Sequence, residues 1–322
     1  MTLDSLWNGI DPLGPGRVRV RVPAKINLAL GVGAKGRDGY HPLATVFQAV
    51  GLYDEVTVTP LPDGEISVVV RGAQAQLVPT DGTDLAARAA DLLRRKRGLP
   101  TYGVSIEIDK RIPVAGGMAG GSADAAATLL ACSELWGFDL PVAELRTLGA
   151  TLGADVPFPL LGGTAIAHGR GTDLVPLMCR GTYYWALAFA ETGLSTPAVF
   201  QRFDELATVE KNTRDVPQEL LSALITGDAK TLGTLLHNDL EPAALDLYPA
   251  LADTLAYGRT RPGVWGGLLS GSGPTCAFLC ENPRVMAALA GELSDLPQVR
   301  AAVGVTAPTR GAHLISAHSY AA

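Results

Sequence analysis

The residues best suited to chemistry form a glycine-rich run near the middle of the chain. Before it, Val104, Ile106 and Ile108 alternate with polar residues, which is typical of a half-buried strand. After it, a run of alanines favours a helix beginning near Ser122. Glycines let backbone N–H groups converge on an anion, and a helix start adds the positive end of its dipole. We therefore predict a phosphate-binding loop made of Pro113, Val114, Ala115, Gly116, Gly117, Met118, Ala119, Gly120, Gly121, Ser122 and Ala123.

A linker or one of the common nucleotide motifs accounts less well for these glycines. A flexible linker joins domains, whereas this loop lies within a dense run of predicted elements. The common P-loop needs a lysine directly after a glycine, and no lysine of the chain has that neighbour. His-Arg-Asp and Asp-Phe-Gly, which mark protein kinases, are absent from the sequence. A GxGxxG match at Gly31–Gly36 is interpreted as a turn, because the residues that follow it cannot open a helix.

Polar residues in two other stretches are candidates for a catalytic or binding role beside this loop. Lys25 and Asn27 lie two positions apart in a strand-like stretch, so they project to the same face. Asp155 follows a predicted helix and stands in a short polar turn. A second glycine loop, Gly271–Gly273, separates two predicted strands. It either packs against the stretch that carries Lys25 and Asn27 and against bound phosphates, or forms a tight turn between the strands.

Three motifs, spread over nearly the whole chain, resemble those of the GHMP kinases (galactokinase, homoserine, mevalonate and phosphomevalonate kinases). They are Pro23-Ala-Lys-Ile-Asn-Leu28, the glycine-rich run after Pro113, and Leu269-Ser-Gly-Ser-Gly-Pro-Thr275. Within the superfamily, Arg37-Asp-Gly-Tyr-His-Pro42 and Gly153-Ala-Asp-Val-Pro157 are similar to the members that phosphorylate 4-diphosphocytidyl-2-C-methyl-D-erythritol in the non-mevalonate isoprenoid pathway.

The resemblance implies transfer of phosphate from ATP to the 2-hydroxyl of that cytidine-diphosphate alcohol, with Mg²⁺ held mainly through the ATP phosphates. It makes Asp155 the group that orients the hydroxyl and accepts its proton, and Lys25 the group that neutralises charge beside it. The simpler alternative is a salt bridge that ties a strand to a helix.

By the same resemblance, Tyr40 and Phe200 would stack on the two faces of cytosine while His41 bonds its polar edge. Stacking combined with edge hydrogen bonds is how proteins generally recognise an isolated base. Without the family, such aromatic residues would more often be core residues. Further positions implied by the resemblance are Asn27, Phe47 and Thr196 on the substrate side and Asp84, Leu85 and Lys110 on the adenine side.

The phosphate loop departs from the family pattern. Where relatives carry Gly-Gly-Gly-Ser-Ser-Asn, this chain has Ala119-Gly-Gly-Ser-Ala-Asp124. A methyl group at Ala119 restricts φ, and Ala123 lacks a hydroxyl that could touch phosphate or metal. Asp124 places a carboxylate near the triphosphate, so the protein ligands of Mg²⁺ are left open.

Composition limits the possible partners. The net charge of -6 and the pI near 5.4 give no general attraction to nucleic acid or to anionic membranes. The longest apolar run, Tyr183–Ala190, is too short to span a bilayer, and Met1–Gly16 lacks the features of a signal peptide. The four cysteines are scattered, as expected of reduced thiols. We expect a cytoplasmic protein, a monomer or weak homodimer, that binds a small anionic ligand.

The overall pattern predicts an α+β protein, and the resemblance implies that it has the two-layer GHMP-kinase fold. The resemblance implies an N-terminal domain like domain 2 of ribosomal protein S5 and a ferredoxin-like C-terminal domain. We expect a leader over residues 1–16, an ATP-binding and catalytic domain over 17–178, and a substrate-binding domain over 179–322. Strands are predicted at 17–22, 23–32, 45–50, 55–60, 65–71, 104–109, 162–169, 183–190 and 299–305, with two more around the second glycine loop. Helices are predicted at 84–97, after 122, and at 142–152, 196–206, 217–226, 229–240 and 283–293.

Two rival functions stay open at this point. Another GHMP kinase, acting on mevalonate or homoserine, would need no aromatic residues to stack on a base. A catalytically silent nucleotide-binding protein is possible because function does not follow from fold, but the presence of both Lys25 and Asp155 speaks against it.

Overall fold

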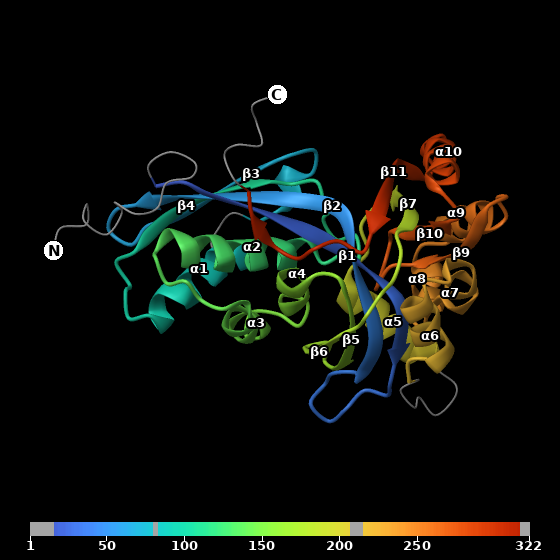
Figure 1. Cartoon of the computed structure of the whole chain (residues 1–322), viewed down its shortest axis with the longest axis horizontal. Coiled ribbons are helices and arrows are strands. Elements are labelled where there is room, and N and C mark those ends of the chain that lie inside the picture. The colour runs from blue at the N-terminus through green and yellow to red at the C-terminus, as the bar shows by residue number, and fades with distance from the viewer. Residues whose placement is uncertain (1–15, 80–82, 207–214, 316–322) are drawn as a thin grey trace.

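The computed structural model describes residues 16–79, 83–206 and 215–315. Its elements form two sheets, each with helices packed against it (Figure 1). The predicted leader, residues 1–16, lies outside the described residues except for Gly16.

The first sheet is built around two long antiparallel strands. The order along its main path is β12-β1-β2-β4-β3, in which only β3 and β4 run parallel. Because β2 is long, its first half pairs with β5 and its second half with β4. These strands are β1 (Val18–Val32), β2 (Leu43–Leu61), β3 (Ile66–Arg71), β4 (Gly103–Asp109), β5 (Thr164–Gly169), β6 (Asp173–Pro176) and β12 (His313–Leu314).

The two long strands each replace two predicted ones. Residues 17–22 and 23–32 were expected as separate strands, and so were 45–50 and 55–60, but each pair is continuous. The β1–β2 register shifts between Pro23 and Ala24 and again between Asn27 and Ala29. Such bulges bend a strand without ending it, so the breaks suggested by Pro23 and by the polar residues of β2 are bends.

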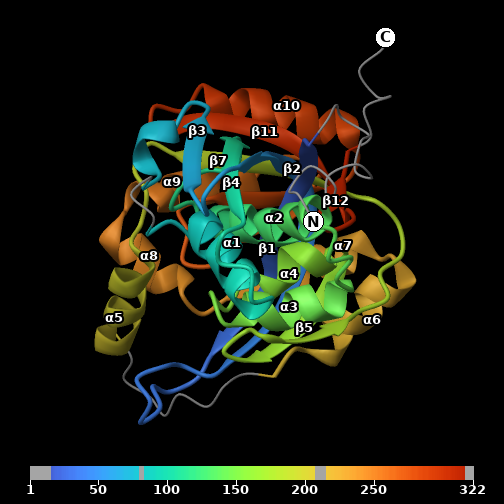
Figure 2. The same ribbon diagram turned by 90° about the vertical axis from the view of Figure 1, so that its left-hand side faces the viewer.

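Helices α1, α2 and α4 pack on one face of this sheet, and α3 packs against these helices (Figure 2). The second of them packs directly on β1 and β2, and its alanines allow the close approach. Asp84, and not Thr83, caps the first helix, since its carboxylate accepts the N–H of Ala87 at 2.8 Å. The bounds are α1 (Leu85–Lys96), α2 (Gly120–Leu135), α3 (Val142–Ala150) and α4 (Pro157–Leu161).

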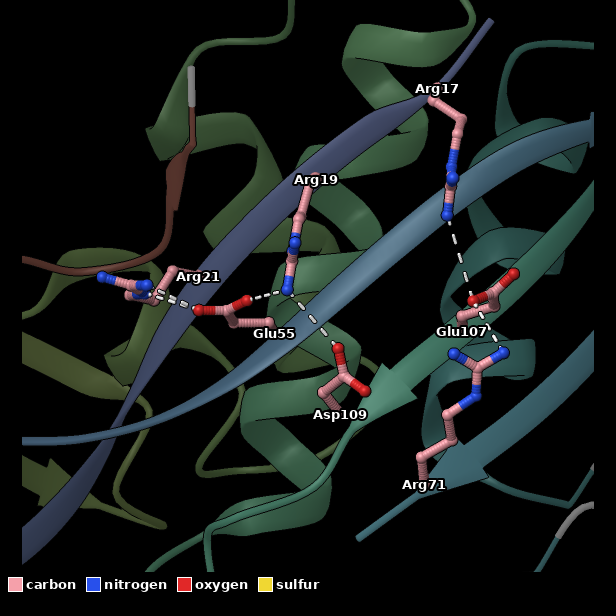
Figure 3. A network of polar contacts seen from close by, with 7 residues as sticks. All are labelled: Arg17, Arg19, Arg21, Glu55, Arg71, Glu107 and Asp109. Carbon is pink, nitrogen blue, oxygen red and sulfur yellow. Dashed lines mark hydrogen bonds and ion pairs between the residues drawn. The ribbon is translucent and has the colours of Figure 1, made fainter. Parts of the chain in front are cut away.

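The other face of the first sheet carries a network of ion pairs (Figure 3). Arg19 and Arg21 both bind Glu55, whose side chain is only 2% exposed. Arg19 also reaches Asp109 at 3.5 Å, and Arg71 lies 3.3 Å from Glu107 on the neighbouring strand. Residues alternate between the faces of a strand. The same alternation that buries the valines of β1 therefore places its arginines on this outer face.

The second sheet is antiparallel, in the order β11-β7-β10-β9. Helix α10 packs on β11 and β7, and α9 packs on β9 and β10. The prediction of strand at 183–190 is confirmed. The bounds are β7 (Tyr183–Ala190), β9 (Val264–Leu269), β10 (Cys276–Cys280), β11 (Val299–Ala307), α9 (Ala250–Arg259) and α10 (Pro283–Ser294).

Between the sheets, one prediction of helix is wrong. Residues 229–240 form a short helix followed by the two-residue strand β8, which pairs with β1 of the first sheet. The apolar spacing of this stretch is helical only as far as Leu235. The remaining elements are α5 (Thr196–Leu206), α6 (Gln218–Thr226), α7 (Ala229–Leu235), β8 (His237–Asn238), α8 (Glu241–Leu247) and the 3-10 turn η2 (Ala75–Leu77).

The architecture is α+β, as predicted. Late parts of the chain nevertheless return to the first sheet: β8 and β12 both pair with β1. Strand β1 accordingly contributes side chains to both large hydrophobic cores, Val18–Ala29 to one and Leu30 and Val32 to the other. Among the described residues, none of the helices combines the length and apolar character that a membrane crossing requires.

Candidate active site

A central cavity of about 300 Å³ lies between the phosphate loop, β1 and the second glycine loop. It gathers residues from all three sequence motifs. Of the predicted site residues, its lining contains Lys25, Asn27, Phe47, Leu85, Pro113, Ala115, Gly116, Gly117, Ala119, Gly120, Gly121, Ser122, Asp155, Thr196 and Phe200. The side chains of Met118 and Ala123 are instead buried in the core.

Lys25 is held in place by a short chain of hydrogen bonds. Its Nζ donates to Asn27 Oδ1 at 2.7 Å, so the predicted shared face of these two residues is confirmed. Asn27 Nδ2 donates to Thr45 Oγ1 at 2.8 Å, and that hydroxyl donates to the Ala29 carbonyl. Both register shifts of β1 flank this pair, as bulges near functional sites often do. The site strand is thus bent around Lys25 and Asn27.

The charge of Lys25 is influenced by burial and by Asp155. The residue is 5% exposed, and burial lowers the pKa of its ammonium, while the Asp155 carboxylate raises it in part. Among the described side chains, no direct ion pair joins the two groups, so the simple salt-bridge alternative does not describe their arrangement. Asp155 stands in the turn between α3 and α4 and lines the same central cavity as Lys25.

The phosphate loop has an unusual backbone. Ala115 and Ala119 adopt left-handed conformations, with φ of 53° and 59°, which cost an alanine about 1–2 kcal/mol each. The helix starts at Gly120, earlier than the predicted Ser122. The conformation expected of a glycine is therefore kept at Ala119, despite its methyl group. Steric strain of this kind, held by surrounding structure, is typical of ligand-binding loops.

The second glycine loop packs against the first. Ser270 Oγ donates to the Gly117 carbonyl at 3.1 Å. A Cβ on Gly117, whose φ is 72°, would lie 2.2 Å from the Ser270 carbonyl oxygen. Gly271 also lies against the stretch of Lys25 and Asn27, as expected, because a Cβ on it would lie 3.3 Å from Lys25 Nζ and 3.4 Å from Asn27 Oδ1. Gly271 and Ser272 join the lining of the central cavity.

A side cavity of about 250 Å³ opens on the other side of the phosphate loop. It contains Asp84, Leu85 and Lys110, which were expected on the adenine side, together with Val114. Leu85, Ala115 and Gly121 line both this cavity and the central one, so the two are neighbours across the loop.

Lys110 is engaged by two carboxylates. Its Nζ lies 2.6 Å from Asp54 Oδ2 and 2.7 Å from Asp124 Oδ2. Burial opposes the charged form of Lys110, but the carboxylates outweigh it and raise its pKa. Asp54 also accepts the N–H groups of Arg111 and Ile112. The Oδ2 oxygen of Asp124, the residue that departs from the family pattern, is therefore paired with Lys110.

One oxygen of Asp124 is unsatisfied. Its Oδ1 is buried and has no hydrogen-bond partner among the described residues. Burial, only partly offset by Lys110, raises the pKa of Asp124 to about 8. Asp54, by contrast, accepts three donors.

An outer cavity of about 930 Å³ adjoins the central one and is lined by Tyr40, His41 and Phe200. His41 and Phe200 stack with ring centroids 5.2 Å apart, and His41 Nδ1 lies 2.8 Å from the Gly33 carbonyl oxygen. Tyr40 is 56% exposed. Gly31 and Val32 are the last residues of β1, so the turn expected over Gly31–Gly36 begins only at Gly33. This hairpin end carries Tyr40 and His41 to the cavity.

Several lining residues escaped the sequence analysis. Arg170 lies over the Tyr40 ring, 3.9 Å from its centroid, and pairs with Asp38 at 2.8 Å. Lys35 lines the same outer cavity. No sequence signal joins Arg170 to Tyr40, because their proximity depends on the pairing of β5 with β2. Ser272 could have been found, since it lies within the third motif.

The central cavity shares lining residues with each of the other two, and Asp155 lies where it meets the outer cavity. The central and outer cavities share Leu43, Ser122, Asp155, Thr196 and Phe200. The carboxylate of Asp155 therefore stands at the junction between the loop with its converging amides and the larger cavity with aromatic walls. The arrangement can hold an extended anion along the loop and a second molecule beside it.

The cavities do not contain an all-protein metal site. Among the described residues, no group of three or more His, Cys, Asp or Glu side chains could hold a metal ion. Asp155 is the carboxylate in the described lining of the central cavity. One carboxylate beside a phosphate loop suits Mg²⁺ that is held mostly by phosphate oxygens.

Comparison with family models identifies two matching segments. Residues 84–163 match the model described as GHMP kinases N terminal domain, and residues 220–297 match the GHMP kinases C terminal model. The first segment contains the phosphate loop and Asp155, and the second ends in the loop after α10.

Relatives and solved structures resemble the chain over most of its length. The 4-diphosphocytidyl-2-C-methyl-D-erythritol kinase of Cutibacterium acnes is 49% identical over 92% of this chain and 97% of its own. The enzyme of that name from Streptomyces coelicolor is 50% identical over 90% and 97%. A crystal structure of 4-(cytidine 5'-diphospho)-2C-methyl-D-erythritol kinase, 34% identical, covers 89% of this chain and 98% of its own with a TM-score of 0.72. Homoserine kinase from Cytophaga hutchinsonii shares the fold, with a TM-score of 0.73 at 17% identity over 94% and 98% of the two chains.

Proposed function

The chain belongs to the GHMP kinase family, and we propose that it transfers the terminal phosphoryl group of ATP to the 2-hydroxyl of 4-diphosphocytidyl-2-C-methyl-D-erythritol. It is a small-molecule kinase, and its relatives at 49–50% identity carry the name of this enzyme. The reaction is a step in isoprenoid precursor synthesis by the non-mevalonate pathway. The likeness to homoserine kinase concerns the fold only.

The observation that carries this proposal is the place of Asp155. It lines the central cavity together with the phosphate loop, and it also lines the outer cavity. An acceptor alcohol reaching inward from the outer cavity meets the carboxylate and the terminal phosphate together. Asp155 orients this hydroxyl and takes its proton as the phosphoryl group arrives, because phosphoryl transfer depends mainly on positioning and electrostatics.

The nucleotide is proposed to extend from the side cavity to the central one. The base lies beside Asp84, Leu85 and Lys110, and the triphosphate follows the backbone amides of residues 113–123. Lys25 then faces the transferred group from β1. Burial lowers the pKa of Lys25, so its positive charge is lost at a lower pH than that of an exposed lysine. When bound, Mg²⁺ neutralises phosphate charge and is held chiefly by the phosphate oxygens.

The cytidine half is proposed to occupy the outer cavity. Phe200 and Tyr40 offer aromatic faces there, and His41, Asn27, Phe47 and Thr196 complete the binding surface between the two cavities. Arg170 and Lys35 bring positive charge to the same cavity, which suits the diphosphate of the substrate.

These assignments give the N-terminal and C-terminal halves of the chain different roles. We assign ATP binding and catalysis chiefly to residues 17–178 and part of the substrate surface to 179–322, with Thr196 and Phe200 as its members. We infer a cytoplasmic location from the small soluble metabolites used, and a monomer or weak homodimer as the working form.

A turnover assay tests the function directly. The full chain is incubated with ATP, Mg²⁺ and one alcohol at a time, and ADP release is followed. We expect turnover with the cytidine-diphosphate alcohol and none with mevalonate or homoserine. CMP should compete with the alcohol because both carry cytosine. Turnover with mevalonate or homoserine, or none with any alcohol, would contradict the proposal.

Asp155→Asn is the sharpest single variant. We expect kcat to fall at least about 100-fold, because a positioned base contributes that much or more. ATP binding, measured by calorimetry, should be retained. Asp295→Asn, on an exposed residue after α10, is the matched control and should keep full activity. Full activity of Asp155→Asn would remove Asp155 from the mechanism.

A further inference from the structure

The segment His237–Glu241 joins the first sheet to the second glycine loop. Its two-residue strand β8 runs parallel to β1, with Asn238 opposite Leu30. The N–H of Asp239 donates to the Leu30 carbonyl at 2.9 Å, and Asp239 Oδ2 accepts the Val32 N–H at 2.9 Å. The segment is therefore fixed to the strand that carries Lys25.

Asn238 uses both of its donor hydrogens and its acceptor oxygen within the protein. Its Nδ2 donates to the carbonyl oxygens of Leu269 at 2.7 Å and Gly271 at 2.8 Å. Its Oδ1 accepts the Leu240 N–H at 2.9 Å. The side chain is 5% exposed. A carboxamide is suited to this position because it combines two donor hydrogens with an acceptor.

The bond to Gly271 has a consequence for the next residue. In a trans peptide, the carbonyl of one residue and the N–H of the next point in opposite directions. The only cis bonds of the described chain precede Pro274 and Pro308. With the Gly271 carbonyl turned to Asn238, the Ser272 N–H is turned away from Asn238.

The surroundings show where that N–H lies. Gly271 and Ser272 line the central cavity, and within the described residues no acceptor binds the Ser272 N–H. A Cβ built on Gly271 would lie 3.3 Å from Lys25 Nζ. Ser272 Oγ is anchored to Thr196 Oγ1 at 2.8 Å. The peptide between Gly271 and Ser272 is thus placed beside the ammonium proposed to face the transferred phosphate.

From these contacts we infer that Asn238 is a positioning residue for phosphoryl transfer. By holding the Gly271 carbonyl, it directs the Ser272 N–H to the terminal phosphate of ATP in the central cavity. The inference rests on the proposed kinase function. It adds a fixed donor from the second glycine loop, where charge develops during transfer.

Asn238→Asp tests this inference by changing one side-chain group. The variant keeps the acceptor for Leu240 but loses both donors and places a carboxylate oxygen against two carbonyl oxygens. We expect kcat to fall at least about tenfold, since a preorganised donor contributes that much or more. The KM for the alcohol should change less than about threefold. Asn238→Ala removes the donors without adding charge and should give the same pattern if the aspartate variant fails to fold.

Glu241→Gln is the matched control. Glu241 belongs to the same segment and supports the same strand end, because its Oε2 accepts the Leu269 N–H at 3.0 Å. Its Oε1 pairs with Arg259 at 2.7 Å, and no bond links it to Gly271 among the described residues. We expect this variant to lose thermal stability while keeping kcat.

Affinity for two nucleotides separates positioning from general damage. Calorimetry with AMP-PNP, an ATP analogue, and with ADP should show that Asn238→Asp weakens only the analogue, by about fivefold or more. Equal losses for both nucleotides, or a kcat loss matched by Glu241→Gln, would overturn the inference. Absence of turnover in the wild type would instead remove the proposed function, while the ratio of dissociation constants would still test Asn238.

Discussion

At the scale of single residues, the trio of Lys110, Asp54 and Asp124 shows how one ammonium organises the base of the phosphate loop. Lys110 precedes the loop and Asp124 follows it, so their 2.7 Å contact closes the loop at its two ends. Asp54 comes from β2 and fixes the pair to the sheet. The carboxylate of Asp124, which looked unfavourable for binding phosphate, thus helps to hold the two ends of the loop together.

The protonation of Asp124 makes stability depend on pH. Its pKa is raised from 3.8 to about 8 by folding, so the folded protein binds the extra proton and the unfolded chain releases it. This contribution to stability is complete below pH 3.8 and is lost as pH rises toward about 8. In the Asp124→Asn variant, the free energy of unfolding should decrease less with pH over this window than in the wild type. At the upper end of the window, the variant should be more stable than the wild type by about 1 kcal/mol or more.

Chemical denaturation at a series of pH values provides the measurement. Asp54→Asn is the control, because that carboxylate accepts three donors. It should destabilise the protein at every pH where the wild type is folded. Parallel pH profiles for the wild type and Asp124→Asn would show that Asp124 is ionised throughout.

At the scale of elements, the contact between the two glycine loops depends on the missing side chain of Gly117. An added Cβ would lie 2.2 Å from the Ser270 carbonyl oxygen, and φ is 72°. Gly117→Ala should therefore separate the loops, reduce kcat more than about tenfold by disturbing preorganised donors, and lower the melting temperature. Gly98→Ala is the control, with φ of 69° and no atom within 4 Å of the added Cβ. It should cost only the backbone strain, about 1 kcal/mol, and keep kcat.

The outer face of the first sheet is expected to contribute to stability alone. Glu55 binds two arginines and is nearly inaccessible, whereas Glu107 is 34% exposed and lies 3.3 and 4.0 Å from its partners (Figure 3). Glu55→Gln should cost about 1–3 kcal/mol, because a buried charged acceptor is lost. Glu107→Gln should cost less than about 1 kcal/mol. Denaturation curves give both values, and unchanged kcat in each variant is the check that this face is remote from catalysis.

Local pattern predicted most of these elements. Alternation identified the strands, and glycines followed by alanines identified the loop and the start of α2 within two residues. It also placed Lys25 and Asn27 on one face. Strands β8 and β12 could not be found this way, because two paired residues carry no periodicity. These two strands form because they pair with backbone groups on the edge of β1 that β2 leaves free. That edge exists only once the sheet has assembled.

The site was predictable where its residues lie in motifs and not where they meet by tertiary pairing. Lys110 was expected on the adenine side and lines the side cavity. Its ion pairs with Asp54 and Asp124 were not predicted. Three positions from separate elements create that cluster, and none has a partner within a helical turn. The contact of Arg170 with Tyr40 likewise depends on strand pairing.

At the scale of the whole molecule, the two halves of the chain are expected to fold together. Strands β8 and β12 complete the first sheet from the second half. The Gly163 N–H donates to the Thr309 carbonyl at 2.7 Å, and the Ala312 N–H to the Pro159 carbonyl at 2.7 Å. Residues 17–178 expressed by themselves should therefore lack a cooperative thermal transition by circular dichroism. Co-expression with 179–322 should restore it, and a cooperative transition of the first piece alone would contradict this expectation.

The continuity of β1 through both cores limits how the molecule can move. β1 pairs with β2 along its length and, near its two ends, with β12 and β8 on its other edge. Bending it further would break ladder bonds to β2. The two halves of the chain should therefore keep a constant angle to each other throughout turnover, without the hinge opening and closing of other kinases. Entry and exit of ligands then fall to the hairpin tip between Gly33 and Pro42, which overhangs the outer cavity and carries Tyr40.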